Sequence, residues 1–356
     1  MKILYLMHVE WNWIKQRPHF IAEYLQKNGC EVDVYHRNGY SKQLVNNETT
    51  INIKPIPRLR GLRFSIIRIL NTLFYYVFLK LIIKTNKYDY IYITHPSLYS
   101  SAIKGKVIYD CMDDHTSFTI PQFERNDITQ KERKLLIKAN IVLFSSDYLA
   151  STIIKRYDTE PRNYIVINNA IELPNISINN HFIKSDSNKL TLTYIGTVSD
   201  WFDFNLLEEI KEKYTKKNIE YDIYGPVDNI SKKSGFNFFG PIEHKKIFEV
   251  MEKSDILIMP FIVNKLIESV NPVKLYEYIY SGKPIICVKY GETEKFEKYV
   301  NLYEQRNVES FIEQIDLIME NGLKGKTSLN ECFDFVNENT WENRTKQILN
   351  FIKAVE

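Results

Sequence analysis

Short apolar runs recur along the chain, and between them lie longer segments in which apolar residues return at helical spacing. Runs of this kind are typical of buried parallel strands, and their alternation with helices predicts β–α–β units. The series ends in a polar stretch, Pro174 to Lys189, and then starts again at Leu190. The pattern therefore predicts an α/β fold of two Rossmann-like domains, 1–180 and 187–335, followed by an amphipathic helix within 337–356. The predicted strands are Ile3 to Met7, Gly29 to Val34, Asp89 to Thr94, Lys106 to Asp110, Asn140 to Ser145, Tyr164 to Ile167, Leu190 to Ile195, Glu220 to Tyr224, Ile256 to Phe261 and Pro284 to Val288.

One short helix is bracketed by two of these strands. It begins in the stretch NPVKLYEYIYSGKPII, where Asn271 can cap a helix and Pro272 has the φ of a first helical residue. In open α/β sheets, ligands bind at the carboxyl ends of the strands, where a helix N-terminus offers free N–H groups and a positive dipole. This helix start is therefore a candidate phosphate site.

Two charged residues lie three positions apart on the same helix. Lys274 could neutralise a diphosphate, and Glu277 could accept hydrogen bonds from ribose hydroxyl groups. A Lys and a Glu at this spacing also form ordinary solvated ion pairs, which is the alternative. Leu275, Tyr278 and Ile279 are expected to face the core.

Two carboxylates follow a strand in the first half. Asp113 and Asp114 come directly after Lys106 to Asp110, and crowded carboxylates raise each other's pKa, which suits a general base. Either residue is the candidate base, and the alternative is that it caps the following turn.

The segment from Pro57 to Lys87 is both apolar and basic, and it contains no acidic residue. Arg68 and Lys80 interrupt the apolar run, so a membrane-spanning helix is not expected. A helix with a broad apolar face and a cationic fringe could bind an anionic membrane surface, and the alternative is a core helix with a few surface cations.

Composition narrows the remaining possibilities. The formal charge of +3 does not indicate a nucleic-acid binder, and the first strand lacks a G-x-G-x-x-G turn for NAD or FAD. Four scattered cysteines without a C-x-x-C pair predict buried thiols in a reducing cytoplasm, and the N-terminus does not have the pattern of a signal peptide. The sequence predicts no metal site and no cofactor.

The stretch from Asn271 resembles the donor-binding helix of GT-B glycosyltransferases of bacterial cell-surface polysaccharide synthesis, near the enzymes of teichuronic-acid and xanthan-type polymers. That helix has the pattern P-x-K-x-x-E-Y followed by a small residue, Gly, Lys and Pro. The resemblance implies the GT-B fold, with two domains facing across a cleft and a last helix that crosses back to the first domain.

The resemblance also implies site residues. It places a nucleotide-diphosphate sugar in the second domain and a glycan acceptor, expected to be carried on a lipid, in the first, with Lys274 and Asp113 or Asp114 in catalysis. Lys274 would replace the metal used by other sugar transferases. The implied donor-binding residues are Gly196, Thr197, Gly225, His244, Asn271, Pro272, Val273, Lys274 and Glu277, and the implied acceptor-binding residues are Trp11, Trp13, Arg17, His19 and His95.

The spacing of the glutamates bears on whether the reaction retains or inverts the configuration at the anomeric carbon. Retaining relatives carry two glutamates eight positions apart, and the position eight before Glu277 is Ser269 with Glu268 one out of register, which favours inversion.

We expect a capsule or cell-envelope enzyme that lies in the cytoplasm at the inner face of the membrane. A nucleotide-sugar 2-epimerase of the same architecture, or a glycan-binding protein without catalysis, remains the alternative; Trp11, Trp13 and His244 could also be structural.

Overall fold

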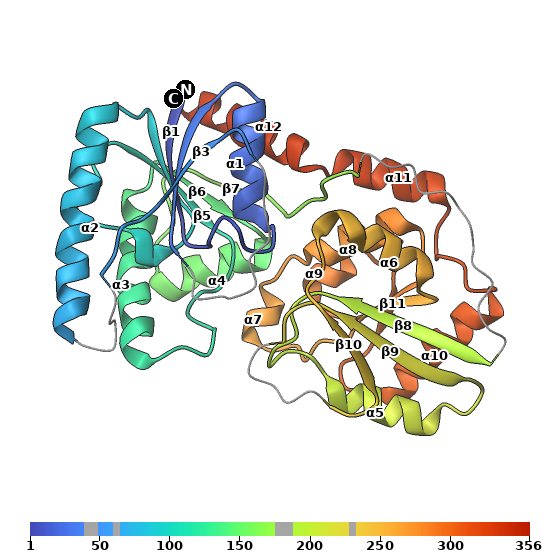
Figure 1. Ribbon diagram of the computed structural model, residues 1–356. Helices are drawn as coiled ribbons and strands as arrows, with labels where there is room; N and C mark the ends of the chain where they lie inside the picture. Colours follow the sequence, from blue (N-terminus) through green and yellow to red (C-terminus); the bar gives the residue numbers. More distant parts are fainter. Residues whose placement is uncertain (39–48, 60–64, 175–187, 228–232) are drawn as a thin grey trace. The chain divides into compact units, whose positions relative to one another are not determined.

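A computed structural model describes residues 1–38, 49–59, 65–174, 188–227 and 233–356 (Figure 1). The chain divides into two compact units. Unit 1 is Met1–Asn168 together with Trp341–Glu356, and unit 2 is Asn169–Thr340. The predicted boundary at residue 180 and most of the predicted linker lie outside the described residues.

Unit 1 is built on a parallel sheet with the strand order β3-β2-β1-β4-β5-β6-β7. The register pairs Tyr5 with Val34 on one side of β1 and with Tyr92 on the other. Because β1 is central, its residues from Ile3 to Met7 are fully buried. The strands are β1 Lys2–Met7, β2 Glu31–His36, β3 Asn52–Pro55, β4 Tyr90–Ile93, β5 Lys106–Cys111, β6 Ile141–Phe144 and β7 Tyr164–Val166.

Helices cover both faces of this sheet, with α1 and α12 on one side and α2 and α3 on the other (Figure 1). The rings of Phe20 on α1 and Trp341 on α12 stack with their centroids 5.1 Å apart, and Trp341 is fully buried. The last helix of the chain is thus part of the core of unit 1. The helices are α1 Arg17–Lys27, α2 Ser65–Asn86, η1 Pro96–Leu98, α3 Gln122–Lys138, α4 Asp147–Tyr157 and α12 Trp341–Val355.

Helix α2 differs from the other helices because it leaves most of its apolar side chains in solvent. Leu79 and Ile82 are buried in the core of unit 1, so one side of the helix packs on the sheet. By length and composition 66–86 could also cross a membrane, which the sequence analysis did not expect; 11% of its apolar 18-residue window is buried. The exposed apolar side chains are Ile66, Ile69, Leu70, Leu73, Phe74, Tyr76, Val77 and Leu81.

Unit 2 repeats the α/β design with the parallel strand order β10-β9-β8-β11-β12-β13. Its strands are β8 Lys189–Ile195, β9 Asn218–Tyr224, β10 Phe236–Gly240, β11 Ile256–Met259, β12 Ile285–Val288 and β13 Asn301–Tyr303. Its helices are α5 Phe204–Lys213, η2 His244–Lys246, α6 Ile247–Lys253, α7 Lys265–Glu268, α8 Val273–Ser281, α9 Gly291–Glu294, α10 Val308–Glu320 and α11 Leu329–Glu338.

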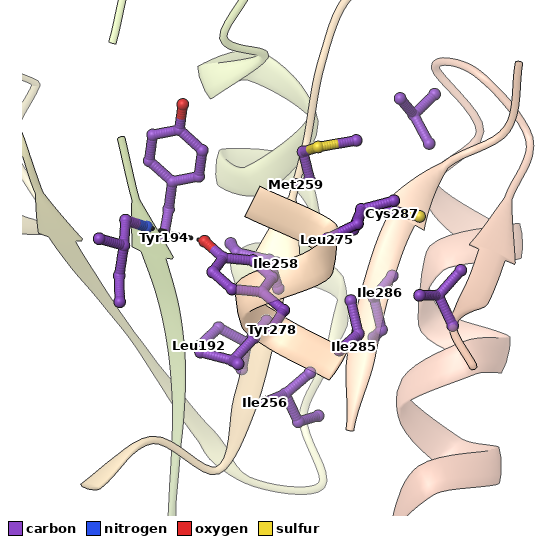
Figure 2. Packing of buried hydrophobic residues seen from close by; sticks show 14 of the residues in the cluster. Leu192, Tyr194, Ile256, Ile258, Met259, Leu275, Tyr278, Ile285, Ile286 and Cys287 are labelled. Carbon is purple, nitrogen blue, oxygen red and sulfur yellow. Dashed lines mark hydrogen bonds between the residues drawn. The ribbon is translucent and has the colours of Figure 1, made fainter. Parts of the chain in front are cut away.

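Helix α8 connects β11 to β12 and packs on the centre of the unit 2 sheet (Figure 2). Leu275, Tyr278 and Ile279 are buried, as predicted. The Ile195 N–H donates to the Tyr278 hydroxyl over 2.9 Å, which is the dashed line in Figure 2. This bond ties the helix to the carboxyl end of β8. Gly282 ends the helix in the left-handed region, with φ of +67°.

Candidate functional site

The Lys274 side chain lies in the first turn of α8, among aromatic rings. Its ammonium is 5.5 Å from the ring centroid of Tyr194 and 5.7 Å from that of Phe261. Burial lowers the pKa of Lys274, and the charge of Glu277 offsets part of that shift. Within the described residues the ammonium forms no ion pair. A half-buried cation of this kind, among aromatic rings, is expected to bind an anion.

Two glycines make room for this lysine at the carboxyl ends of β8 and β9. A Cβ atom at Gly196 would lie 2.0 Å from Lys274 Cε, and a Cβ at Gly225 would lie 2.1 Å from the Gly196 carbonyl oxygen. Both glycines have positive φ, +157° and +139°. Thr197 follows directly, and its carbonyl accepts from the Tyr194 hydroxyl over 2.8 Å. Glycine at these two positions therefore lets the Lys274 side chain and the two strand ends pack closely together.

The predicted cap of α8 is wrong. Asn271 does not bond to the helix N–H groups; instead its Oδ1 accepts from the Asn169 N–H at 2.9 Å, and its Nδ2 donates to the buried carboxylate of Glu292 at 3.0 Å. Pro272 occupies the cap position, and no side chain among the described residues caps Val273 or the rest of this first turn. The first N–H groups of α8 therefore stay available.

Glu277 is held by a histidine. The His244 Nε2 lies 2.8 Å from Glu277 Oε1, and the His244 Nδ1 lies 3.9 Å from the Glu172 carboxylate. The structure thus brings together all of the predicted donor-binding residues that belong to α8, η2 and the two glycine turns. Sequence reasoning missed Asn169 and Glu292, because their partner, Asn271, is far away in the chain and no local signal marks such pairs.

The two candidate bases in unit 1 differ sharply. Asp114 is 1% exposed and accepts from Arg156, Thr116 and Ser117; despite burial, these bonds, with Arg156 first, lower its pKa to about 2. Asp113 is partly exposed, and no hydrogen bond to its carboxylate occurs among the described residues. Burial, together with the charges of neighbouring carboxylates, raises the pKa of Asp113 to about 7.

Two predicted acceptor contacts are instead structural. Arg17 is 3% exposed, and its guanidinium donates twice to Asp110 through Nε and Nη2 and once to the Ile167 carbonyl at 2.7 Å. His19 is fully buried, and its Nε2 lies 3.0 Å from the Trp11 carbonyl oxygen. Both residues have no surface left for a ligand; Arg17 joins the start of α1 to β5, and His19 holds the loop before α1.

The remaining acceptor candidates are placed differently. Trp11 is 2% exposed and packs against the His19 ring, with the centroids 5.2 Å apart. Trp13 is half-buried, in the loop before α1. His95 follows β4, and its Nδ1 accepts from the Ser97 N–H at 3.0 Å. His95 therefore stays at the carboxyl edge of the sheet, whereas Trp11 belongs to the core. Among the described residues, no group of three or more His, Cys, Asp or Glu side chains could hold a metal ion.

Comparison with known proteins identifies both halves of the chain. Residues 19–174 match the family described as Glycosyltransferase Family 4, and residues 184–331 match Glycosyl transferases group 1. A protein of Bacillus subtilis (strain 168), provisionally assigned as the teichuronic acid biosynthesis glycosyltransferase TuaH, is 26% identical over 226 residues. That alignment covers 58% of this chain and 56% of the relative, so the chain spans about half the length of the curated relative it matches.

Solved structures share the fold. Sucrose-phosphate synthase from Thermosynechococcus elongatus has a TM-score of 0.75 at 13% identity, covering 100% of this chain and 99% of its own. HepE of Anabaena, solved with UDP and glucose, has a TM-score of 0.71 at 13% identity and covers 99% of both chains. The first half of the chain thus matches Glycosyltransferase Family 4 and the second half matches Glycosyl transferases group 1, and the chain is a glycosyltransferase of the GT-B fold.

Proposed function

We propose that this glycosyltransferase moves a hexose from a nucleotide-diphosphate sugar to a glycan acceptor, carried on a lipid, in the synthesis of a cell-surface polysaccharide. The observation that carries the proposal is the Lys274 ammonium, which lies without an ion-pair partner among the described residues, at the uncapped start of α8. The UDP and glucose in the HepE structure support a donor of this class.

The donor diphosphate would bind to the free N–H groups of α8 and to Lys274. Glu277 lies one turn further along, on the same face, where it could accept from the ribose hydroxyls while His244 holds it in place. As the bond from the sugar C1 to the diphosphate breaks, negative charge grows on the leaving group. Lys274 and the N–H groups would stabilise that charge, so we propose a reaction without a metal ion, which unchanged turnover in EDTA would support.

Asp113 is the proposed base. Its carboxylate would take the proton from an acceptor hydroxyl, and the resulting oxygen would attack C1 as the diphosphate leaves. A pKa of about 7 suits this role because the group is then partly ionised and a useful proton acceptor near neutral pH. A single displacement inverts the anomeric carbon, and NMR of the product would reveal the configuration.

Replacing Lys274 by Ala tests the donor site. In a thermal-shift panel of UDP, GDP, CMP and dTDP, the native protein should be stabilised by one of them, by about 2.7 kcal/mol at a hundred times its Kd. Loss of a charge-assisted contact worth about 1.5–3 kcal/mol should weaken the binding of that nucleotide by about 10- to 150-fold. Lys265→Ala is the matched control, because Lys265 is exposed on α7. Equal affinity in the Lys274→Ala and native proteins would refute the donor assignment.

The acceptor would reach the enzyme at an anionic membrane surface, on the cytoplasmic side. Helix α2 presents eight exposed apolar side chains over 22 residues, and Lys80, Lys84 and Lys87 lie at its carboxyl half and end. Basic residues close to an anionic leaflet contribute about 1 kcal/mol each, and the apolar face adds to this by burial. A soluble substrate would require no such face, which favours transfer to a lipid-linked acceptor over the epimerase alternative.

Vesicle binding tests this face. The double substitution Leu73→Glu and Val77→Glu should lower co-sedimentation with anionic vesicles by at least about tenfold, because it puts two charges into the apolar face. The control Leu317→Glu changes a similarly exposed leucine on α10 in unit 2. Native protein that does not bind vesicles at low salt, or a double variant that binds as well as native protein, would remove the membrane from the proposal.

A further inference from the structure

Basic side chains gather at the carboxyl ends of neighbouring strands in unit 1. His8 follows β1, Arg37 follows β2 and His95 follows β4; these strands are adjacent in the order β2-β1-β4. His115 follows β5, next to β4. Lys131 reaches the same place from α3. We call these five residues the basic cluster.

The two cations of the basic cluster converge on one neutral atom. Arg37 Nη2 donates to the Ser97 carbonyl oxygen at 3.1 Å, and Lys131 Nζ lies 3.5 Å from the same oxygen. Lys131 also pairs with Asp127 at 2.8 Å. Arg37 forms no ion pair with any carboxylate of the described residues, and Ser97 is the only acceptor of its guanidinium there. Two like charges this close repel each other, and Asp127 offsets that repulsion on the Lys131 side, whereas Arg37 has no carboxylate partner among the described residues.

The pKa of Arg37 supports this interpretation. Burial lowers it, and so does the nearby charge of Arg58, whereas Tyr75, Glu124 and Asp127 act in the opposite direction without reversing the shift. A guanidinium has five N–H donors in a planar fork that matches the oxygens of a phosphate group. Arg37 uses one of its donors within the described residues, so the fork has donors to spare.

The three imidazoles of the basic cluster lie against one another as neutral groups. The His95 ring centroid lies 4.2 Å from that of His115 and 4.9 Å from that of His8. Burial is the first cause that keeps the pKa of each one low, to about 4 in His115. Because the His95 Nδ1 accepts from Ser97, the neutral ring carries its proton on Nε2 and can donate it. The His115 Nε2 is buried without a partner among the described residues.

We propose that Arg37 and Lys131, with the His95 Nε2–H, form a phosphate site in unit 1 that binds the phosphate group of the acceptor. The proposal rests on the proposed function, and it adds that the acceptor carries a phosphate. The donor diphosphate has its own site at Lys274 in unit 2. The position supports a lipid phosphate, because Tyr75 of α2 donates to the carbonyl of Leu98, the residue after Ser97, at 2.8 Å. The phosphate site thus adjoins the helix with the apolar face.

The experiment measures binding of inorganic pyrophosphate by calorimetry, in protein that carries Lys274→Ala so that the donor site is weakened. This protein should still bind pyrophosphate, and adding Arg37→Gln should weaken the binding at least tenfold. Adding Arg37→Lys should weaken it less, because the charge stays. The matched control is Arg133→Gln, since Arg133 is exposed on the same helix as Lys131 and should change affinity less than twofold. If Arg37→Gln does not fold, Lys131→Gln replaces it with the same expectation.

Pyrophosphate binding that Arg37→Gln leaves unchanged, or no binding by the Lys274→Ala protein, overturns the proposal. Anionic vesicles distinguish the two sources of phosphate: Arg37→Gln should bind them as native protein does, and a tenfold loss would assign the cluster to phospholipid headgroups instead. In protein that carries Arg37→Gln alone, the nucleotide should raise the melting temperature by as much as in native protein. Failure of the donor assignment therefore appears in the nucleotide experiment with Lys274→Ala, and failure of this proposal appears in the pyrophosphate experiment.

Discussion

Asp113→Asn is expected to lower turnover by about 10²- to 10⁴-fold, the usual contribution of a positioned general base, while nucleotide binding stays unchanged. The reason is that the amide cannot accept the proton of the acceptor hydroxyl. The carboxylate is partly exposed and makes no hydrogen bond within the described residues, so the fold should not depend on it. The melting temperature of the Asp113→Asn protein should be no lower than that of the native protein. Turnover within threefold of native would exclude Asp113 as the base.

The pH profile gives an independent check on the same residue. Burial raises the pKa of Asp113 to about 7, so the carboxyl is protonated and inactive as a base below that pH. Turnover should therefore fall tenfold per pH unit below about pH 7, and the residual turnover of Asp113→Asn should lack this limb. Asp114→Asn is the matched comparison: with a pKa of about 2, Asp114 is ionised throughout this range, and its loss should lower stability without moving the limb.

Arg17→Met is expected to cost about 3–5 kcal/mol of the free energy of unfolding, because it leaves the carboxylate of Asp110 buried without its cation. Both side chains of this ion pair are almost completely buried, and Asp110 keeps only the Tyr92 hydroxyl as a further partner among the described residues. The loss should appear as a shift of the urea midpoint at constant slope.

A double variant separates the charge from the packing. Arg17→Met with Asp110→Leu removes both charges and should recover part of the loss, since an apolar pair of similar volume leaves no buried ion. Lys138→Met at the exposed end of α3 should change stability by less than about 0.5 kcal/mol. If Arg17→Met were as stable as native protein and only weakened acceptor binding, the original assignment of Arg17 as an acceptor contact would return.

The sequence was sufficient for those features that depend on local pattern. The apolar runs predicted the buried strands of both sheets, and the spacing in α8 predicted its core face correctly. Local chemistry also accounts for the start of α5, where the Asp203 side chain caps the helix by accepting from the Leu206 N–H. Edge strand β3, with the sequence NIKP, and helix α3, with few apolar residues, lack such a pattern, and neither was predicted.

Features that depend on distant partners could not be found in this way. Asp113 and Asp114 are neighbours in sequence, and what separates their pKa values is Arg156, which lies on α4. Asn271 has the side chain of a helix cap, but its amide is hydrogen-bonded to Asn169 and Glu292 instead of to the helix. The resemblance implied that Arg17 binds the acceptor. Its burial depends on the ion pair with Asp110, which is far away in the sequence.

The contribution of α12 to unit 1 bears on how the protein is made. On the ribosome, residues 1–168 emerge long before Trp341, so the Phe20 ring must wait for its stacking partner until all of unit 2 has been synthesised. Unit 2 comes from one continuous segment and can fold as soon as it has left the tunnel. A premature stop shortly before Trp341 would therefore damage the half of the molecule that was translated first, and spare the half that was translated last.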